Sequence, residues 1–286
     1  MARNITYQQA IGEALAQEME RDETVIVMGE DIAGGGDRED KQDAWGGPMR
    51  LTKGLVGDFG RQRIRDTPIS EAGYVGLSVG AAMTGMRPIA ELMFGDFSLL
   101  TMDQLVNQAA KIRYMTGGQC KVSLTLRLSM GAGRSSAAQH SQSLHALFAH
   151  IPGLKVAIPS CPGDAKGLLK SAIRDDNPIL FFEDKMMYND VGPVPEQDYV
   201  IPLGQADVKR AGSDITLVAT SSMVGLSLQA ADALAEDGVD AEVVDVRTLY
   251  PLDADTLVES AKKTGYAIII DEGAARYGVT GELASV

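Results

Sequence analysis

The sequence predicts an α/β protein of two domains. Short, continuous apolar runs alternate with longer segments whose apolar residues recur at helical spacing. Residues 186–202 interrupt this alternation with three prolines and no periodicity, and the alternation restarts beyond them. We therefore expect an N-terminal domain with a mainly parallel sheet over residues 1–190, a linker over 191–203 and a smaller α/β domain over 204–286. A chain of 286 residues is long enough to bury two such cores.

Composition and charge narrow the class of protein. The formal net charge of −13 argues against nucleic acid and anionic membranes as partners. No apolar run approaches the roughly 18 residues of a membrane span, and the N-terminus has no secretory apolar core. The two cysteines, Cys120 and Cys161, lie far apart and form neither a disulfide framework nor a zinc motif. We expect a cytoplasmic protein.

The chain begins with a helix followed by a buried strand. Thr6 and Gln9 have the spacing of a capping box, and apolar residues follow at helical spacing. The run VIVM at residues 25–28 predicts a strand that is buried on both faces. Glu30 follows this strand, at a position where α/β sheets contact ligands but where any strand must also emerge into water.

The stretch of residues 66–80 (DTPISEAGYVGLSVG) predicts a helix with very little side-chain bulk. Pro68 disfavours helix at the preceding residue, Ser70 takes the N-cap position, and Glu71 falls in the first turn, where the helix dipole favours a carboxylate. Each of its three glycines costs about 1 kcal/mol relative to alanine, so we expect another backbone or a ligand to approach closely. From this pattern alone, Glu71 is more often structural than functional.

The rest of the N-terminal domain continues the alternation. We expect strands over residues 87–94, 122–128, 154–158 and 179–182, and helices from Asp96 to about Tyr114 and over residues 163–174. Asp96 is expected to cap the first of these helices, and Leu100 to face inward from it. In the C-terminal domain, the apolar runs at 215–219, 241–246 and 267–271 predict a βαβαβ unit whose first two strands are parallel.

The three histidines all lie within eleven residues, at His140, His145 and His150. Spacings of five place them on different faces of a helix, which disfavours a shared metal site. His140 lies in a loop after a predicted strand and is a candidate general acid or base, or a substrate contact. A structural role is the alternative.

Several segments resemble, in order along the chain, the β subunits of thiamine-diphosphate-dependent 2-oxo acid dehydrogenase complexes, which belong to the transketolase superfamily. These segments are DTPISEAGYVGLSVGAAMTGMRP, AELMFGDF, NQAAKIRYMTGG, AAQHSQS, HIPGLKV, DAKGLLKSAIRDDNP and VRTLYPLD. The matches run from about Ile5 to Glu272. TYQQAIGEALAQEM and AWGG are most similar to the acetoin dehydrogenase branch, with the pyruvate dehydrogenase branch nearest to it. The resemblance implies a pyrimidine-binding domain followed by a transketolase-type C-terminal domain.

The resemblance also implies roles for individual residues. Glu71 matches the glutamate that hydrogen-bonds the pyrimidine ring of thiamine diphosphate and favours its imino tautomer. Phe97 matches the aromatic residue that stacks on this ring, and Ile69 and Met93 match its apolar neighbours. His140 matches the histidine that faces the substrate or the incoming lipoyl group. The positions that bind a structural potassium ion in some members are matched by Leu124, Ala172, Asp175 and Asn177.

One motif of thiamine-diphosphate enzymes is missing from the sequence. Mg²⁺ and the diphosphate are usually held by a G-D-G…N motif, and this chain has Gly57-Asp58 and Gly95-Asp96 but no G-D-G followed by a suitable asparagine. We therefore expect a separate α subunit to supply Mg²⁺ and the diphosphate half of the site, in an α2β2 heterotetramer docked on a dihydrolipoamide acyltransferase core. Family members continue beyond Val286 through a further helix and strand, so the C-terminal domain is expected to be incomplete here.

The resemblance implies cleavage of acetoin, or decarboxylation of a 2-oxo acid such as pyruvate, with transfer of the acyl unit to lipoamide. A pyruvate or branched-chain 2-oxo acid dehydrogenase β subunit is the alternative within the family. A split transketolase that acts on sugars without lipoamide, and a non-catalytic α/β interaction module, are the alternatives outside it.

Overall fold

A seven-stranded sheet forms the centre of the N-terminal domain in the computed structural model, which describes residues 2–34 and 46–286. The strands lie in the order β12-β6-β7-β5-β4-β2-β3, and all neighbours are parallel except β12 and β6. They are β2 (Val25–Gly29), β3 (Ile64–Asp66), β4 (Arg87–Leu92), β5 (Thr125–Met130), β6 (Lys155–Ala157), β7 (Ile179–Asp184) and β12 (Thr248–Tyr250). The predicted parallel α/β sheet is confirmed.

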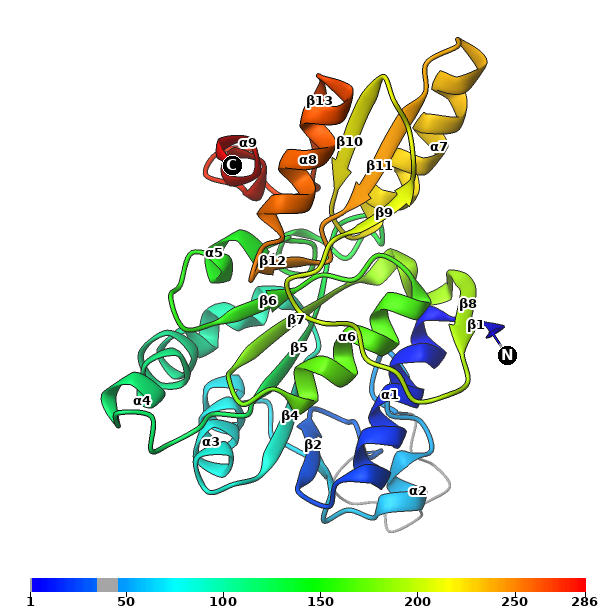
Figure 1. Ribbon diagram of the computed structural model, residues 1–286. Helices are drawn as coiled ribbons and strands as arrows, with labels where there is room; N and C mark the ends of the chain where they lie inside the picture. The colour runs from blue at the N-terminus through cyan, green and yellow to red at the C-terminus, as the bar shows by residue number, and fades with distance from the viewer. Residues whose placement is uncertain (1, 35–45) are drawn as a thin grey trace.

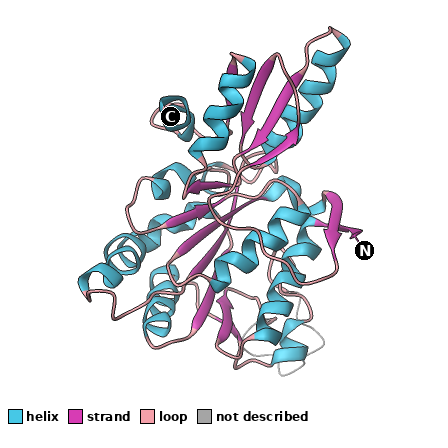
Figure 2. Cartoon of the chain, viewed as in Figure 1, coloured by secondary structure: helices cyan, strands magenta, loops and turns pink. Residues whose placement is uncertain are grey.

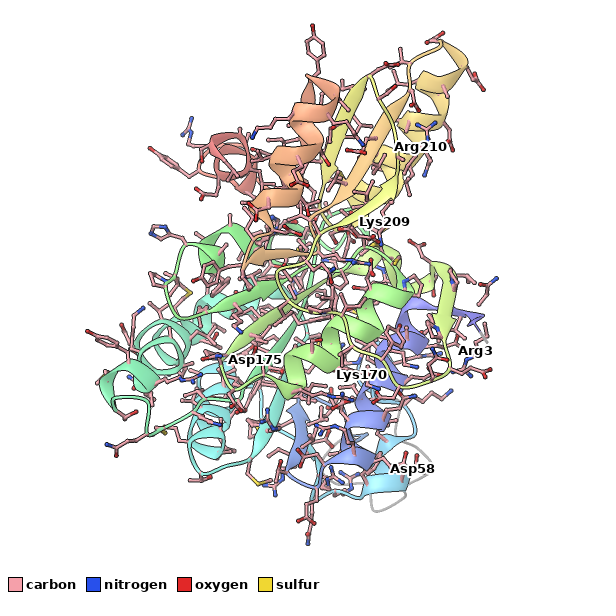
Figure 3. The ribbon with its side chains drawn as sticks, viewed as in Figure 1. Arg3, Asp58, Lys170, Asp175, Lys209 and Arg210 are labelled. Carbon is pink, nitrogen blue, oxygen red and sulfur yellow. The ribbon has the colours of Figure 1, made fainter. Side chains whose placement is uncertain are left out.

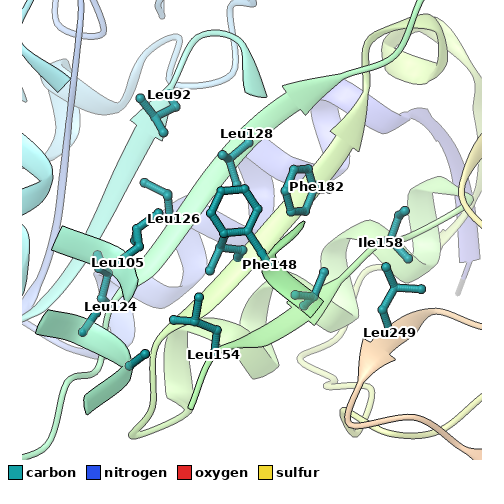
Figure 4. Close-up of a cluster of buried hydrophobic side chains, with 14 of the residues drawn as sticks. Leu92, Leu105, Leu124, Leu126, Leu128, Phe148, Leu154, Ile158, Phe182 and Leu249 are labelled. Carbon is teal, nitrogen blue, oxygen red and sulfur yellow. The ribbon is translucent and has the colours of Figure 1, made fainter. Parts of the chain in front are cut away.

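Helices cover both faces of this sheet (Figures 1 and 2). One face carries α1 (Tyr7–Arg21), α2 (Leu55–Phe59) and α6 (Pro162–Arg174). The other carries α3 (Glu71–Met83), α4 (Ala110–Met115) and α5 (His145–Ala149). Figure 4 shows part of the core on this second face, where Leu126 and Leu128 of β5 lie near Phe148 and Phe182. Within the described residues, no helix is both long enough and apolar enough to span a bilayer.

Local sequence signals at the start of the chain are confirmed. The Thr6 hydroxyl accepts a hydrogen bond from the Gln9 backbone N–H at 3.1 Å, and the Gln9 side chain accepts one from the Thr6 N–H at 2.9 Å. This reciprocal pair satisfies two donors that a helix start would leave unpaired. Every residue of β2 is buried, as its continuous apolar run predicts.

The single helix predicted between Asp96 and Tyr114 is wrong in detail. The segment forms a 3₁₀ helix, η2 (Gly95–Thr101), then a π-helical stretch, η3 (Asp103–Ala109), and only then α4. Asp96 accepts a hydrogen bond from the Gln142 side chain at 2.7 Å instead of capping a helix. Leu100 is 60 % exposed. π-Helical stretches are often found at functional sites, and this one lies against α3.

A buried arginine connects the three central strands. Arg127 of β5 is 1 % exposed and contacts the Glu183 carboxylate of β7 through two hydrogen bonds of 2.7 and 2.8 Å. A third hydrogen bond of 2.7 Å reaches Glu91 on the opposite neighbour, β4. The Tyr188 hydroxyl donates to Glu183 at 3.0 Å. Burial raises the pKa of the Glu91 carboxyl, and the Arg127 charge opposes this rise.

The C-terminal domain contains a four-stranded sheet in the order β13-β10-β11-β9. β10 is parallel to both β11 and β13, so the predicted βαβαβ unit is confirmed. The antiparallel edge strand β9 was not predicted. The elements are β9 (Asp207–Arg210), β10 (Ile215–Ala219), α7 (Ser222–Glu236), β11 (Ala241–Asp245), α8 (Ala254–Thr264), β13 (Ala267–Ile270) and α9 (Val279–Ser285).

Two strands depart from the predicted division of the chain. β8 (Val191–Pro195) lies within the segment predicted to be an aperiodic linker and pairs antiparallel with β1 (Ala2–Thr6). β12 comes from the C-terminal part of the chain but pairs with β6 at the edge of the N-terminal sheet (Figure 1). Backbone hydrogen bonds therefore join the C-terminal part of the chain to the N-terminal sheet.

An ionic cluster reinforces the contact between the domains. Lys209 of β9 lies at this boundary (Figure 3) and contacts Asp164 of α6 at 2.5 Å. Arg247 contacts the other oxygen of Asp164 at 2.6 Å. Asp245 is fully buried beside them, 3.6 Å from the Lys209 Nζ. Burial raises the pKa of the Asp245 carboxyl to about 7, with Lys209 opposing and Asp164 adding to the rise.

Replacing Arg127 with methionine should strongly destabilise the fold. The change leaves Glu91 and Glu183 buried without their counter-charge, which costs about 3–5 kcal/mol. Urea unfolding of Arg127→Met would measure the loss. The exposed Arg276→Met is the matched control and should stay within about 0.5 kcal/mol of the parent. Equal unfolding midpoints for the two variants would contradict the proposed importance of the buried cluster.

The titration of Asp245 should make the stability fall with rising pH. The unfolded chain loses this proton above about pH 3.9, whereas the folded chain holds it to about pH 7. Between these values the unfolded state binds fewer protons, so the free energy of unfolding falls by up to about 1.4 kcal/mol per pH unit. Asp245→Asn, which cannot ionise, should therefore gain stability relative to the parent between pH 5 and pH 8.

Thermal unfolding at both pH values would measure this relative gain. The exposed Asp237→Asn is the control and should show the same offset from the parent at pH 5 and pH 8. An Asp245→Asn offset that stays constant over this interval would contradict the raised pKa.

Candidate active site

The predicted functional residues follow the carboxyl ends of neighbouring parallel strands. Glu30 follows β2, Glu71 follows β3, Phe97 follows β4 and His140 follows β5. These four strands are adjacent in the order β5-β4-β2-β3. Parallel strands bring their carboxyl ends to one edge of a sheet, which is where open α/β sheets bind ligands.

Glu71 is the first residue of α3, as predicted, and is only 6 % exposed. Ser70 is at the predicted N-cap position, but its side chain makes no capping hydrogen bond. The carboxylate of Glu71 therefore lies at the positive end of a 13-residue helix dipole and is largely shielded from solvent. A shielded carboxyl group of this kind is suited to accept a hydrogen bond from a ligand that carries an N–H donor.

Glu30 is a second carboxyl group close to Glu71. Burial raises the pKa of Glu30, and the charges of Glu71 and Asp31 add to the rise. The Glu30 Oε1 atom is buried, and no hydrogen-bond partner for it exists among the described residues. Buried unpaired polar atoms are uncommon in folded proteins and often mark places where a ligand or water binds. From the sequence, Glu30 follows a buried strand, where contact with a ligand and simple emergence of the strand into water were the two alternatives.

Three aromatic rings lie together where β4 and β5 end. The centre of the His140 ring lies 4.6 Å from the centre of the Phe94 ring and 5.4 Å from the centre of the Phe97 ring, and both pairs meet edge to face. Phe94 and Phe97 are 5.6 Å apart and also meet edge to face. The structure thus brings together Phe97 and His140, which the sequence associates with different roles. It adds Phe94, whose position in an apolar run gave no separate signal.

The two predicted apolar neighbours differ in exposure. Met93 follows β4 and is half-buried, and its carbonyl accepts a hydrogen bond from the Ser129 hydroxyl. Ile69, in the turn before α3, is 85 % exposed. An isoleucine this exposed beside a buried carboxylate leaves apolar surface available for contact with a ligand or another chain.

The outward-facing side of α3 is small and apolar. A Cβ at Gly76 would lie 3.4 Å from the Gln104 side chain of η3, which is an ordinary van der Waals contact, so the close approach of another backbone or a ligand stays a prediction. No atom lies within 4 Å of a Cβ built at Gly80. Exposed apolar residues surround this side; we call Ile69, Leu77, Met83, Leu99 and Leu100, together with Gly80, the outer face of α3. Several exposed apolar side chains around one helix make it a candidate interaction surface.

The positions predicted to bind potassium lie where strands begin, at the end of the sheet opposite to Glu71: Leu124 directly precedes β5, and Ala172, Asp175 and Asn177 precede β7. Figure 3 shows Asp175 at the C-terminal end of α6. Its carboxylate accepts hydrogen bonds from the Asn177 backbone at 2.8 Å and from Lys155 at 2.5 Å. The carbonyl oxygens of Leu124 and Ala172 accept hydrogen bonds from Ile179 and Asp175. These residues are brought together, and the ion itself stays a prediction.

The three histidines have separate environments. His145 is fully buried and its Nε2 atom lies 3.0 Å from Asp271 of the C-terminal domain. His150 is exposed. Over residues 2–34 and 46–286, no three His, Cys, Asp or Glu side chains are arranged to hold a metal ion.

Comparison with protein families gives two matches. The model of the transketolase pyrimidine-binding domain matches residues 3–191, and the model of the transketolase C-terminal domain matches residues 204–286. A solved chain described as a split-gene transketolase, inactive β4 tetramer, has a similar fold. Its TM-score is 0.79 at 22 % identity, with 98 % of this chain and 85 % of that chain covered.

Comparison with curated proteins finds relatives that match along this whole chain. It is 54 % identical to the β subunit of acetoin:2,6-dichlorophenolindophenol oxidoreductase from Bacillus subtilis, covering 100 % of this chain and 84 % of the relative. The corresponding subunit from Cupriavidus necator is 50 % identical with the same coverage. The 2-oxoisovalerate dehydrogenase β subunit of Bacillus subtilis is 44 % identical, covering 99 % and 84 %.

Proposed function

We propose a function from the premise that this chain belongs to the transketolase-type β subunits of the acetoin and 2-oxo acid dehydrogenases. It is the β subunit of an oxidoreductase component that uses thiamine diphosphate, cleaves acetoin and transfers the two-carbon unit to lipoamide. The observation that carries this proposal is Glu71, a buried carboxylate at a helix start, on the same sheet edge as Phe97 and His140.

The residues present fit the pyrimidine half of thiamine diphosphate. The Glu71 carboxylate would accept a hydrogen bond from a pyrimidine nitrogen, Phe97 would stack on the ring, and Met93 and Ile69 would supply apolar contacts. The unpaired, buried Oε1 of Glu30 supports a ligand at this edge. When bound, thiamine diphosphate supplies a carbon nucleophile that allows a C–C bond next to a carbonyl group to break.

Glu71 has the main chemical role among these residues. Its carboxylate would accept a hydrogen bond from the pyrimidine ring and would so favour the imino tautomer of the cofactor. Positioned acid–base help of this kind contributes about 10²–10⁴-fold to a rate. The start of α3 holds the carboxylate in a site that is largely shielded from water. His140, at the rim of the aromatic group, would contact the substrate or the acyl acceptor.

Membership in a family of β subunits implies an α partner. We propose that the α subunit covers the outer face of α3 and brings Mg²⁺ and the residues that bind the diphosphate. Two observations support this: the exposed apolar side chains around α3, and the lack of a G-D-G…N motif in the sequence. An α2β2 assembly on a dihydrolipoamide acyltransferase core completes the proposal.

A 2-oxo acid is the second candidate for the substrate. The pyruvate dehydrogenase β subunit of Rickettsia felis is 45 % identical, close to the 44 % of the 2-oxoisovalerate enzyme. Acetoin is preferred because its two relatives are 54 % and 50 % identical over the full chain.

Glu71→Gln should abolish turnover in the reconstituted α/β complex without dissociating it. Glutamine is nearly isosteric but cannot hold the pyrimidine proton, so the rate should fall by at least about 10²-fold. Acyl transfer to lipoamide and size-exclusion chromatography would measure the two effects. Glu20→Gln, an exposed change on α1, is the control and should leave the rate unchanged. Near-normal turnover by Glu71→Gln would contradict the role proposed for Glu71.

A substrate screen of the parent complex should give the highest kcat/KM with acetoin. Pyruvate, 2-oxoisovalerate and sugar phosphates should be tested alongside it, with and without lipoamide. A preference for pyruvate or 2-oxoisovalerate would move the assignment to that enzyme. Activity with sugar phosphates alone would identify a split transketolase, and no thiamine diphosphate binding in calorimetry would leave only an interaction module.

A further inference from the structure

We propose that Lys185 is a positioning residue that fixes His140 at the candidate active site. Lys185 is the first residue of the 3₁₀ helix η5 (Lys185–Asn189), directly after β7. Its side chain is 1 % exposed, and its Nζ atom donates a hydrogen bond to the backbone carbonyl of His140. The inference rests on the proposed function, which gives His140 its contact with the substrate or acyl acceptor.

The segment that carries His140 has an unfavourable backbone and little regular structure. Between β5 and the short helix η4 (Ala138–His140), positive φ angles occur at Gly131 (94°), Gly133 (96°), Ser135 (55°) and Ala137 (63°). Residues with a Cβ rarely adopt such angles, and clusters of them persist only where the surroundings hold them. Contacts from other elements must therefore hold this segment in place.

Lys185 constrains both the backbone and the ring environment of His140. Besides its hydrogen bond to the His140 carbonyl, its Nζ atom lies 5.2 Å from the centre of the Phe94 ring. Phe94 in turn meets the His140 ring at 4.6 Å. A cation over an aromatic face is attracted to it, so the same ammonium group contacts both the His140 backbone and the Phe94 ring beside the His140 side chain.

A buried ammonium group is costly unless nearby charges compensate it. Burial lowers the pKa of Lys185, while the carboxylates of Asp96, Asp184 and Glu272 raise it. Two of these acids also hold the segment itself: Asp96 accepts a hydrogen bond from Gln142 at 2.7 Å, and Glu272 accepts one from Ser143 at 2.6 Å. The acids that stabilise the ammonium group thus also anchor the residues that follow His140.

The chain contains a matched lysine whose contacts lie on α1, on β8 and in the segment after β8. Lys166 of α6 is fully buried and donates to the Pro195 carbonyl at 3.0 Å. Its Nζ atom lies 5.6 Å from the centre of the Tyr199 ring. Lys166→Met therefore removes a hydrogen bond to a backbone carbonyl and a cation–π contact, as Lys185→Met does, and in addition an ion pair with Glu13 at 3.1 Å.

A double-mutant cycle in the α/β complex tests the proposal. Lys185→Met should lower kcat for acyl transfer to lipoamide by about 10- to 100-fold, the scale expected when a reacting group is misplaced by about 1 Å. In the His140→Ala background the same change should alter the rate less than about twofold, because no histidine remains to be positioned. Lys185→Arg, which keeps a charged donor, should recover part of the rate.

A structural role without positioning gives a different result. Equal losses from Lys185→Met in both backgrounds, or an equal loss from Lys166→Met, would overturn the proposal. Melting temperatures of the complexes would establish that the variants fold. If Lys185→Met does not fold, the cycle is run with Lys185→Arg, and equal losses in both backgrounds again overturn the proposal.

A second measurement separates the positioning role from the proposed function. The three histidine ring signals of a selectively ¹³C-labelled β chain can be followed by NMR in the complex. Lys185→Met should shift or broaden the His140 signal and leave the His145 and His150 signals unchanged. Lys166→Met should not cause this change in the His140 signal. Absence of activity with every substrate would defeat the proposed function only. An unchanged His140 signal in Lys185→Met would defeat the positioning role, whatever the activity.

Discussion

The ion cluster around Arg127 is the constraint on which the site depends most directly. Arg127 sits in the middle strand and contacts Glu91 on one neighbour and Glu183 on the other. Because all three groups are buried, moving any of these strands along its neighbour would leave a charge without a partner. The same strands end in the aromatic group, the His140 segment and Lys185. The cluster therefore sets the register of the elements that carry the chemistry.

The C-terminal domain also contributes to the geometry of the site. The segment after His140 is tied to that domain through Ser143 and Glu272, and through His145 and Asp271. Strand β12 joins the N-terminal sheet itself, next to β6. These contacts are far apart in sequence, so their effect is to couple the position of the His140 segment to the packing of the two domains. The C-terminal domain thus helps to hold the His140 segment in its position at the site.

Sequence patterns predicted the elements that are determined locally. The capping box at Thr6 and the buried run of β2 need only neighbouring residues, and both are confirmed. The predictions that were wrong depended on distant contacts: Asp96 bonds to Gln142 rather than capping a helix, and β8 pairs with β1 within the predicted linker. The same distinction applies to the proposed site. The resemblance predicts roles for Glu71 and Phe97, whereas Phe94 and Lys185 have no sequence signal of their own, because what distinguishes them is contact with His140.

The distribution of polarity around α3 explains why such a site would be divided between two subunits. Glu71 is buried at the start of the helix, yet the outer face of the same helix is small, apolar and exposed. Exposed apolar side chains are unfavourable in water, so their burial would drive association with a complementary chain. The partner would then remove water from the neighbourhood of Glu71 and strengthen every electrostatic interaction that the carboxylate makes. Assembly of the subunits and activation of the carboxylate would then occur in one step. Close packing against a partner would also offset the loss of helix stability that the glycines cause in α3.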